Sequence, residues 1–292
     1  MSVLGTIVES TRARVAERRR VRPMEELTAR LRDAPEPRSL HDAIAKGFGV
    51  IAEHKRRSPS GGASDPENLS RAYATYADTP WIVGVSVLTD EPYFDGSIDD
   101  LAVARDRVEK PVLRKDFIID DYQVVEARAF GADAILLMAS VLADEPATMR
   151  RLYEHARALG LDVLVELGMT ERPIESLLSI VPAEARIWGV NARQFAKRGE
   201  GGRAPAGAAR ADATSFAPGQ KHDLPTDIAA HREHRKLVPP GKLAVAESGI
   251  HRAAELAAAR DAGYDAALIG TAFLAPERRI RDVVDELGRV FT

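Results

Sequence analysis

From residue 48 to its C-terminus, the chain alternates short apolar runs with amphipathic helical patterns, and this alternation constrains the fold more than any other feature. Met149, Leu152, Ala156 and Leu159, for example, follow the helical period. Strict alternation of strand and helix predicts a parallel sheet with right-handed crossovers. The eight strand-like runs lie at residues 48–53, 81–88, 111–114, 133–138, 162–167, 186–190, 242–247 and 265–269.

The number of repeats favours one of two parallel architectures. Eight repeats of about thirty residues fit a closed barrel, although an open doubly wound sheet also reaches eight units in large enzymes. Three helix-to-strand junctions, at residues 131–133, 160–162 and 263–265, share a Gly-x-Asp pattern whose glycine can end a helix in the left-handed conformation. We therefore predict an α/β fold, the (β/α)8 TIM barrel.

Two segments fall outside the alternation. Residues 1–47 are predicted to form a helical extension, with helices at 2–20 and 24–32, packed on a barrel of residues 48–292. The arginines of the first helix also suit a transit peptide or a lipid-binding helix, but its acidic residues and few serines oppose that reading. The Gly-, Ala- and Pro-rich residues 196–223 are predicted to be a flexible insertion. Disorder is favoured over a lid, because the segment has few large apolar residues.

Composition excludes several classes of function. The chain of 292 residues has no cysteine, so it has neither disulfides nor thiolate metal sites. A formal net charge of -3 opposes a general nucleic-acid binder. No apolar run approaches the roughly 20 residues that span a bilayer, and no signal-peptide core is visible. We expect a cytoplasmic protein that binds neither nucleic acid nor membrane.

Charged and amide side chains follow five of the predicted strands. In a parallel barrel, active-site groups lie at the C-terminal ends of the strands. A lone Lys or Glu after a strand is usually a solvated loop residue, but several at one rim indicate an active site. The side chains are Glu53 and Lys55, Lys115, Glu166, Asn191 and Glu247.

The surroundings of these groups lead to two expectations about proton transfer. Glu166 is flanked by apolar residues, and burial there would raise its pKa towards a value useful for proton transfer. Lys55 and Lys115, if close together, would lower each other's pKa and help one of them act as a general acid near neutral pH.

Small residues at the ends of the last two strands predict a phosphate site. They are Ser248-Gly249 and Gly270-Thr271, at the positions where barrels often bind phosphate through backbone N–H groups. Ser58 and the Gly61-Gly62 turn are part of the same predicted phosphate site. They lie in residues 58–62, a stretch that we expect no strand or helix to accommodate. The alternative is that these glycines only make tight turns.

Five stretches together resemble the indole-3-glycerol phosphate synthase family, the lyase of tryptophan biosynthesis. The resemblance extends from about residue 40 to the C-terminus, apart from the insertion. It implies ring closure, decarboxylation and dehydration of 1-(2-carboxyphenylamino)-1-deoxyribulose 5-phosphate, without cofactor or metal. The stretches are residues 51–60, 86–97, 112–120, 246–250 and 268–270.

The resemblance also implies a role for each rim residue. Lys115 would be the general acid, Glu166 the proton-transfer partner in dehydration, and Lys55, oriented by Glu53, a stabiliser of negative charge that can share the acid role. Asn191 and Glu247 would orient the substrate and the lysines. The implied substrate-binding residues are Arg193 near the anthranilate carboxylate, Phe94, Phe117 and Leu136 in the aromatic pocket, and Ser58, Ser248, Gly249, Gly270 and Thr271 around the phosphate.

The chain departs from the family pattern in places, and other readings stay open. Ala192 and Gln194-Phe195 alter the strand-six motif, Leu167-Gly168 replaces a more polar pair, and His54 replaces an apolar residue, where we expect an effect on packing or stability. A phosphoribosylanthranilate isomerase-like barrel is one alternative, but that chemistry prefers a Cys or Asp pair. A non-catalytic pathway scaffold is another, but it would be expected to lose a catalytic residue. We expect a monomer or a weak homo-oligomer.

Overall fold

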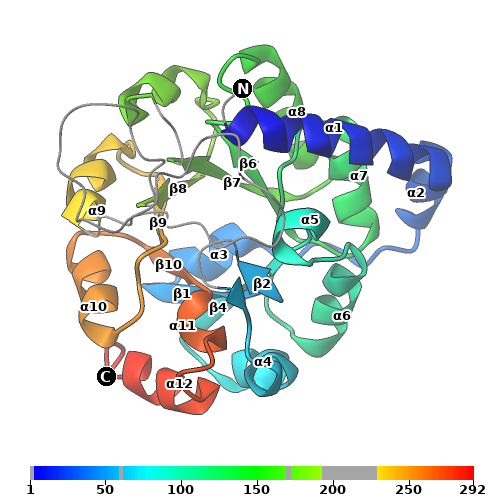
Figure 1. Cartoon of the computed structure of the whole chain (residues 1–292). Coiled ribbons are helices and arrows are strands. Elements are labelled where there is room, and N and C mark those ends of the chain that lie inside the picture. The colour runs from blue at the N-terminus through cyan, green and yellow to red at the C-terminus, as the bar shows by residue number, and fades with distance from the viewer. Residues whose placement is uncertain (1–2, 59–61, 169–171, 193–228) are drawn as a thin grey trace, which may run out of the picture.

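Eight parallel strands form a closed barrel in the computed structural model, which describes residues 3–58, 62–168, 172–192 and 229–292 (Figure 1). The order around the barrel is β1-β10-β9-β8-β7-β6-β5-β4. All eight predicted strands are present, and the TIM barrel is confirmed because β1 pairs with both β4 and β10, which leaves no open edge. The strands are β1 Gly49–His54, β4 Ile82–Leu88, β5 Val112–Lys115, β6 Ala134–Met138, β7 Asp162–Leu167, β8 Ile187–Asn191, β9 Leu243–Glu247 and β10 Ala266–Ile269.

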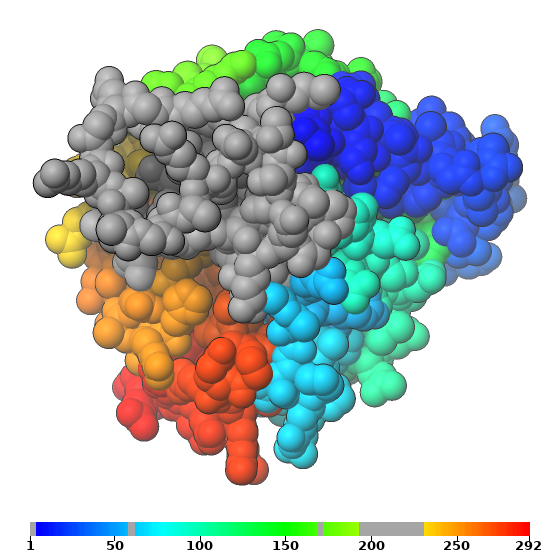
Figure 2. Space-filling view, in the orientation of Figure 1, coloured from blue at the N-terminus to red at the C-terminus, as the bar shows by residue number. Residues whose placement is uncertain are grey.

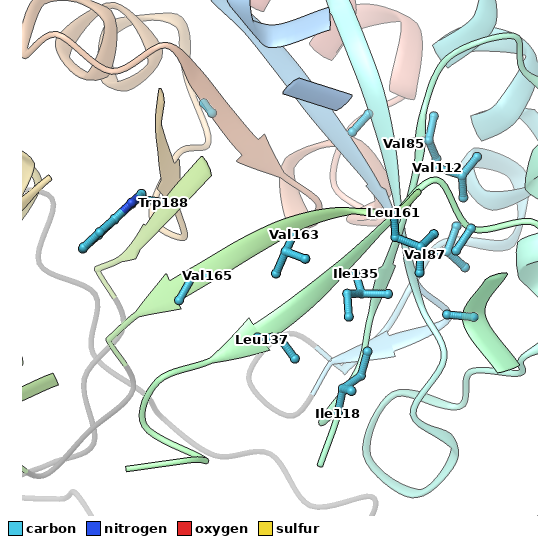
Figure 3. Packing of buried hydrophobic residues seen from close by; sticks show 14 of the residues in the cluster. Val85, Val87, Val112, Ile118, Ile135, Leu137, Leu161, Val163, Val165 and Trp188 are labelled. Carbon is cyan, nitrogen blue, oxygen red and sulfur yellow. The ribbon is translucent and has the colours of Figure 1, made fainter. Parts of the chain in front are cut away.

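Helices surround the barrel and cover its outer face (Figure 1). Met149, Leu152 and Ala156 are buried on α8, as their spacing predicts. Figure 3 shows the outer layer of the core, in which Ile135 and Leu137 of β6 lie beside the valines of β7. The helices after β1 are α4 Pro66–Asp78, α5 Glu91–Phe94, α6 Asp99–Arg107, α7 Asp121–Ala129, α8 Pro146–Ala158, the 3-10 helix η1 Ile174–Ile180, α9 Ala229–His234, the 3-10 helix η2 Arg235–Leu237, α10 Ala253–Asp261, α11 Thr271–Leu274 and α12 Ile280–Gly288.

The repeated Gly-x-Asp pattern has two structural functions. Its glycines end helices with φ of 87°, 78° and 87° at Gly131, Gly160 and Gly263, as predicted. Its aspartates accept backbone N–H groups at the opposite rim from the predicted site: Asp133 from Val112 at 2.8 Å, Asp162 from His41 at 2.9 Å and Asp265 from Ala244 at 2.7 Å. Asp133 and Asp265 therefore join the amino-terminal ends of neighbouring strands, and Asp162 joins β7 to α3.

The barrel interior is apolar at its amino-terminal end and polar at its carboxyl end. Side chains alternate between the two faces of each strand, so every second residue points inward. Helix α3, Leu40–Ala45, closes the amino-terminal end with Leu40 and Ile44. Above it lie the inward apolar residues Ile51, Leu113, Leu136, Leu164, Val245 and Leu268. One step further along the strands come the charged residues of the carboxyl rim.

Helices α1 Val3–Val21 and α2 Met24–Arg30 precede α3 and lie close to the predicted bounds. Figure 2 shows their blue surface in direct contact with the barrel helices. Four arginines join α1 to the barrel, through the pairs Arg12–Glu145, Arg14–Asp90, Arg18–Glu126 and Arg19–Asp120. Within the described ranges no helix is long and apolar enough to cross a membrane.

One expectation about backbone structure was wrong. Arg57–Ser58 forms a short strand, β2, that pairs antiparallel with β3, Gly62–Ala63, so the stretch does accommodate strands. Gly62 has φ of 76°, which allows the chain to turn back on itself within a few residues. The insertion at residues 196–223 lies outside the described residues.

Candidate active site

The carboxyl rim encloses a pocket of about 890 Å³, including its open mouth. Twelve of the fifteen predicted site residues line this pocket, so their strand-end positions do bring them together at one rim. They are Glu53, Lys55, Phe94, Lys115, Phe117, Leu136, Asn191, Glu247, Ser248, Gly249, Gly270 and Thr271.

Glu53 and Lys55 form a pair at the end of β1. The Lys55 Nζ donates to Glu53 Oε1 at 2.7 Å and to Thr271 Oγ1 at 3.1 Å. Both side chains are almost fully buried. A Cβ atom at position 270 would overlap Oε1 of Glu53, so Gly270 leaves the space that this carboxylate needs. The predicted orientation of Lys55 by Glu53 is therefore present in the structure.

Lys115 lies between two carboxylates from other strands. Its Nζ is 3.5 Å from Glu166 Oε2 and 3.7 Å from Glu247 Oε2. Asn191 Nδ2 donates to the other Glu166 oxygen at 3.0 Å, which fixes that carboxylate. Strands β5, β7, β8 and β9 thus bring one cation, two acids and one amide to a single point.

The expectation that two lysines lower each other's pKa was wrong for Lys115. Burial lowers the pKa of Lys115, but the negative charges of Glu166, Glu247 and Glu53 outweigh burial, so its pKa is raised above the usual range. The closest charges to Lys115 are carboxylates, which the sequence could not place relative to each lysine. Lys115 is therefore charged at neutral pH.

Glu247 is the member of this cluster most affected by burial. Burial and the negative charge of Glu166 raise its pKa well above the usual range, although Lys115 acts in the opposite direction. Both of its oxygens are buried, beside the Lys115 ammonium group and the Glu166 carboxyl group. A Cβ atom at position 189 would overlap Glu247 Oε1, so Gly189 provides the space for this carboxyl group. The site thus holds a carboxyl group that gives up its proton less readily than an ordinary glutamate does.

Phe94 and Phe117 lie on the apolar side of the pocket, with Leu136. Phe94 ends the short helix α5, which Asp90 caps by accepting the Tyr93 N–H at 3.0 Å. Asp90 also pairs with Arg14 of α1 at 2.5 Å. Burial, with the negative charge of Asp116, raises the pKa of Asp90 to about 7, and Arg14 opposes that shift.

Three predicted site residues do not line the pocket. Glu166 is fully buried behind Lys115 and Asn191. Ser58 lies on β2, but its side chain and the whole of Arg193 lie outside what the structure describes.

Sequence reasoning missed other pocket residues. Asp90 lies two residues after β4 and Asp116 directly follows β5, so the same strand-end rule could have found them. The remaining ones carried no signal in the sequence beyond their strand-end positions: Leu88, Met138, Ile250, His251, Leu268 and Ile269.

Comparisons with known proteins give the family. The family model described as "Indole-3-glycerol phosphate synthase" matches residues 4–197, more than half of the chain. The chain belongs to the indole-3-glycerol phosphate synthase family. Proteins of that name from Mycolicibacterium smegmatis and Nocardioides sp. are 37% and 38% identical to it, covering 97% and 96% of this chain and 94% and 97% of the relatives.

A third relative gives the same result. The indole-3-glycerol phosphate synthase of Rhodopirellula baltica is 34% identical over 94% of both chains. The predicted resemblance to this synthase family is therefore confirmed, as is the prediction of a carbon–carbon lyase rather than an isomerase. The match begins at residue 4 and so includes the helices before the barrel.

Proposed function

We propose that the rim pocket converts 1-(2-carboxyphenylamino)-1-deoxyribulose 5-phosphate into indole-3-glycerol phosphate, carbon dioxide and water. The observation that carries this proposal is the position of Lys115, a charged amine that lines the pocket and is held between two buried carboxyl groups. The substrate has the matching parts: an aromatic ring, a carbonyl to be protonated and a phosphate.

Lys115 acts as the general acid in ring closure. The ring carbon that bears the carboxylate attacks the ribulose carbonyl, and the developing negative charge on the carbonyl oxygen takes a proton from Nζ. Three carboxylates stabilise the ammonium form of Lys115, so the group carries its proton before substrate binds. A positioned acid of this kind contributes about 10²- to 10⁴-fold to the rate.

Glu166 and Glu247 act on either side of Lys115. After carbon dioxide leaves, Glu166 is the proton-transfer partner for the loss of water, held by Asn191 in the required orientation. Glu247 orients the Lys115 ammonium group, with its Oε2 3.7 Å from Nζ. The two carboxyl groups thus divide between proton transfer and the orientation of Lys115.

Lys55 stabilises negative charge at the end of β1. Its Nζ already bonds Glu53 and Thr271, which places the ammonium group at the junction of β1 and β10. Phe94, Phe117 and Leu136 hold the anthranilate ring, and Arg193 lies near its carboxylate. The phosphate is held by Ser58, Ser248, Gly249, Gly270 and Thr271.

Other features of the protein are part of the same proposal. The enzyme works without cofactor or metal, because protonation of the ring system provides the electron sink. It acts in the cytoplasm as a monomer or weak homo-oligomer, and residues 1–47 form an extension on a catalytic barrel of residues 48–292. The residue 196–223 insertion is a spacer, so deleting residues 197–221 should leave the kinetics unchanged.

The test is a fluorescence assay for indole formation with the synthetic substrate. Turnover by the purified chain without added metal or cofactor is the expected result. If the folded chain showed no turnover in buffers with or without divalent metal, the proposal would be contradicted.

A further inference from the structure

His231 is a buried residue of α9 that contacts the first residue after β9. Only 3% of His231 is exposed, and its Nε2 lies 3.1 Å from the carbonyl oxygen of Ser248. Because a carbonyl oxygen only accepts, Nε2 is the donor. The Tyr264 ring packs edge-on against the imidazole at 5.5 Å and 84°, and its Oη donates to the His231 carbonyl at 2.9 Å. Tyr264 therefore fixes both the side chain and the backbone of His231.

Ser248 has a backbone conformation that needs support. Its φ is 68°, and that of Gly249 is 80°, so two consecutive residues are left-handed. For a residue with a side chain this conformation is strained. The hydrogen bond from His231 to the Ser248 carbonyl holds the strained peptide in place.

The direction of that carbonyl sets the direction of the next N–H group. The peptide between Ser248 and Gly249 is trans, so its C=O and N–H point in opposite directions. The carbonyl points to His231 on α9, so the Gly249 N–H points away from α9, towards the pocket that both residues line. Among the described atoms this N–H has no hydrogen-bond partner. It is an available donor for an anion.

We propose that His231 is a positioning residue for the phosphate monoester of the substrate. By holding the Ser248 carbonyl on the α9 side, it directs the Gly249 N–H at the phosphate. This proposal rests on the phosphate subsite in the proposed function. His231 touches no reacting atom, so it acts on substrate binding and not on the chemical step.

Kinetics of matched variants test this role. His231→Phe keeps a ring against Tyr264 but lacks the donor, and it should raise KM for the phosphorylated substrate about ten-fold with kcat within two-fold. His231→Gln retains an N–H donor and should stay within about three-fold of wild type in KM. His234→Phe, on the same helix, is the control and should match wild type.

The substrate without its phosphate separates binding from general structure. His231→Phe should leave kcat/KM unchanged for 1-(2-carboxyphenylamino)-1-deoxyribulose. An unchanged KM for the phosphorylated substrate, or an equal loss on both compounds, would overturn the proposal. Equal turnover of both compounds by the wild type would instead show that the pocket has no phosphate subsite, and it would also contradict the role of His231.

A measurement on the wild type covers the case in which the variants do not fold. Inorganic phosphate should shift the imidazole NMR signals of His231, because its hydrogen bond tightens when an anion engages the next peptide. The signals of His155, which pairs with Asp121 on the outside of the barrel, should not move. The absence of a His231 shift at saturating phosphate would overturn the proposal.

Discussion

The carboxylate of Glu53 occupies the space that a side chain at residue 270 would take, and Gly270 leaves that space free. The same carboxylate accepts the Lys55 Nζ at 2.7 Å. The smallness of one residue at the end of β10 therefore sets the position of the ammonium group at the end of β1.

Gly270→Ala should lower kcat/KM about 100-fold or more, because the added methyl displaces Glu53 and with it Lys55. Overpacking should also lower the free energy of unfolding by about 1–3 kcal/mol. Steady-state kinetics and urea unfolding measure the two effects. Gly288→Ala, on α12, is the control for a Gly→Ala change away from the pocket. Activity of Gly270→Ala within three-fold of wild type would show that Glu53 and Lys55 do not depend on this space.

Glu247→Gln should move the alkaline limb of the pH–kcat/KM profile to lower pH. Burial lowers the pKa of Lys115 and three carboxylates raise it, so removing one negative charge lowers that pKa. The wild type should not lose activity through deprotonation of Lys115 until the pH rises above about 10, near the ordinary pKa of lysine. A surface change, Glu67→Gln, is the control. An alkaline limb for the wild type near pH 8 would contradict the charged state assigned to Lys115.

Arg14→Gln should reduce kcat/KM about ten-fold, mainly through KM. The substitution leaves the buried carboxylate of Asp90 without its cation and loosens the cap of α5, which carries Phe94. Arg19→Gln removes a more exposed pair on the same helix, Arg19–Asp120, and should leave the kinetics unchanged. Equal effects of the two variants would mean that α1 acts as a whole and not through Asp90.

His54→Phe should flatten the dependence of stability on pH between 6.5 and 4. Burial lowers the pKa of His54 to about 4, so the unfolded chain takes up a proton from pH 6.5 downward while the folded protein does not. Stability is therefore present above pH 6.5 and lost as the pH falls to 4, by about 2–3 kcal/mol for this residue. Phenylalanine keeps the stacking on Tyr73, which has a centroid distance of 4.4 Å. Urea unfolding at pH 8 and pH 5 measures the change, and an equally steep loss in the variant would exclude His54 as its source.

Much of the fold was predictable, because the strands and helices of a (β/α)8 barrel have clear periods. The β2–β3 pair was missed because two strands of two residues are too short to show a period. Helix α3 was missed as well, although Leu40 and Ile44 close the barrel. Short elements of this kind depend on tertiary contacts more than on local sequence.

Most of the pocket-lining residues were predictable, and so was the Glu53–Lys55 pair, but the surroundings of Lys115 were not. The strand-end rule found Lys55, Lys115 and Glu247, because a barrel brings all strand ends to one rim. Distances between them depend on the register of the closed sheet, so the sequence could not show that carboxylates surround Lys115. His231 carried no signal at all, since its contact with Ser248 joins two segments across the fold.

The general-acid role of Lys115 is the central claim, and kcat of Lys115→Ala tests it most directly. The variant should lose about 10³-fold or more in kcat in the fluorescence assay, with a far-ultraviolet circular dichroism spectrum like that of the wild type. A folded Lys115→Ala enzyme that keeps kcat within about three-fold of wild type would contradict the claim.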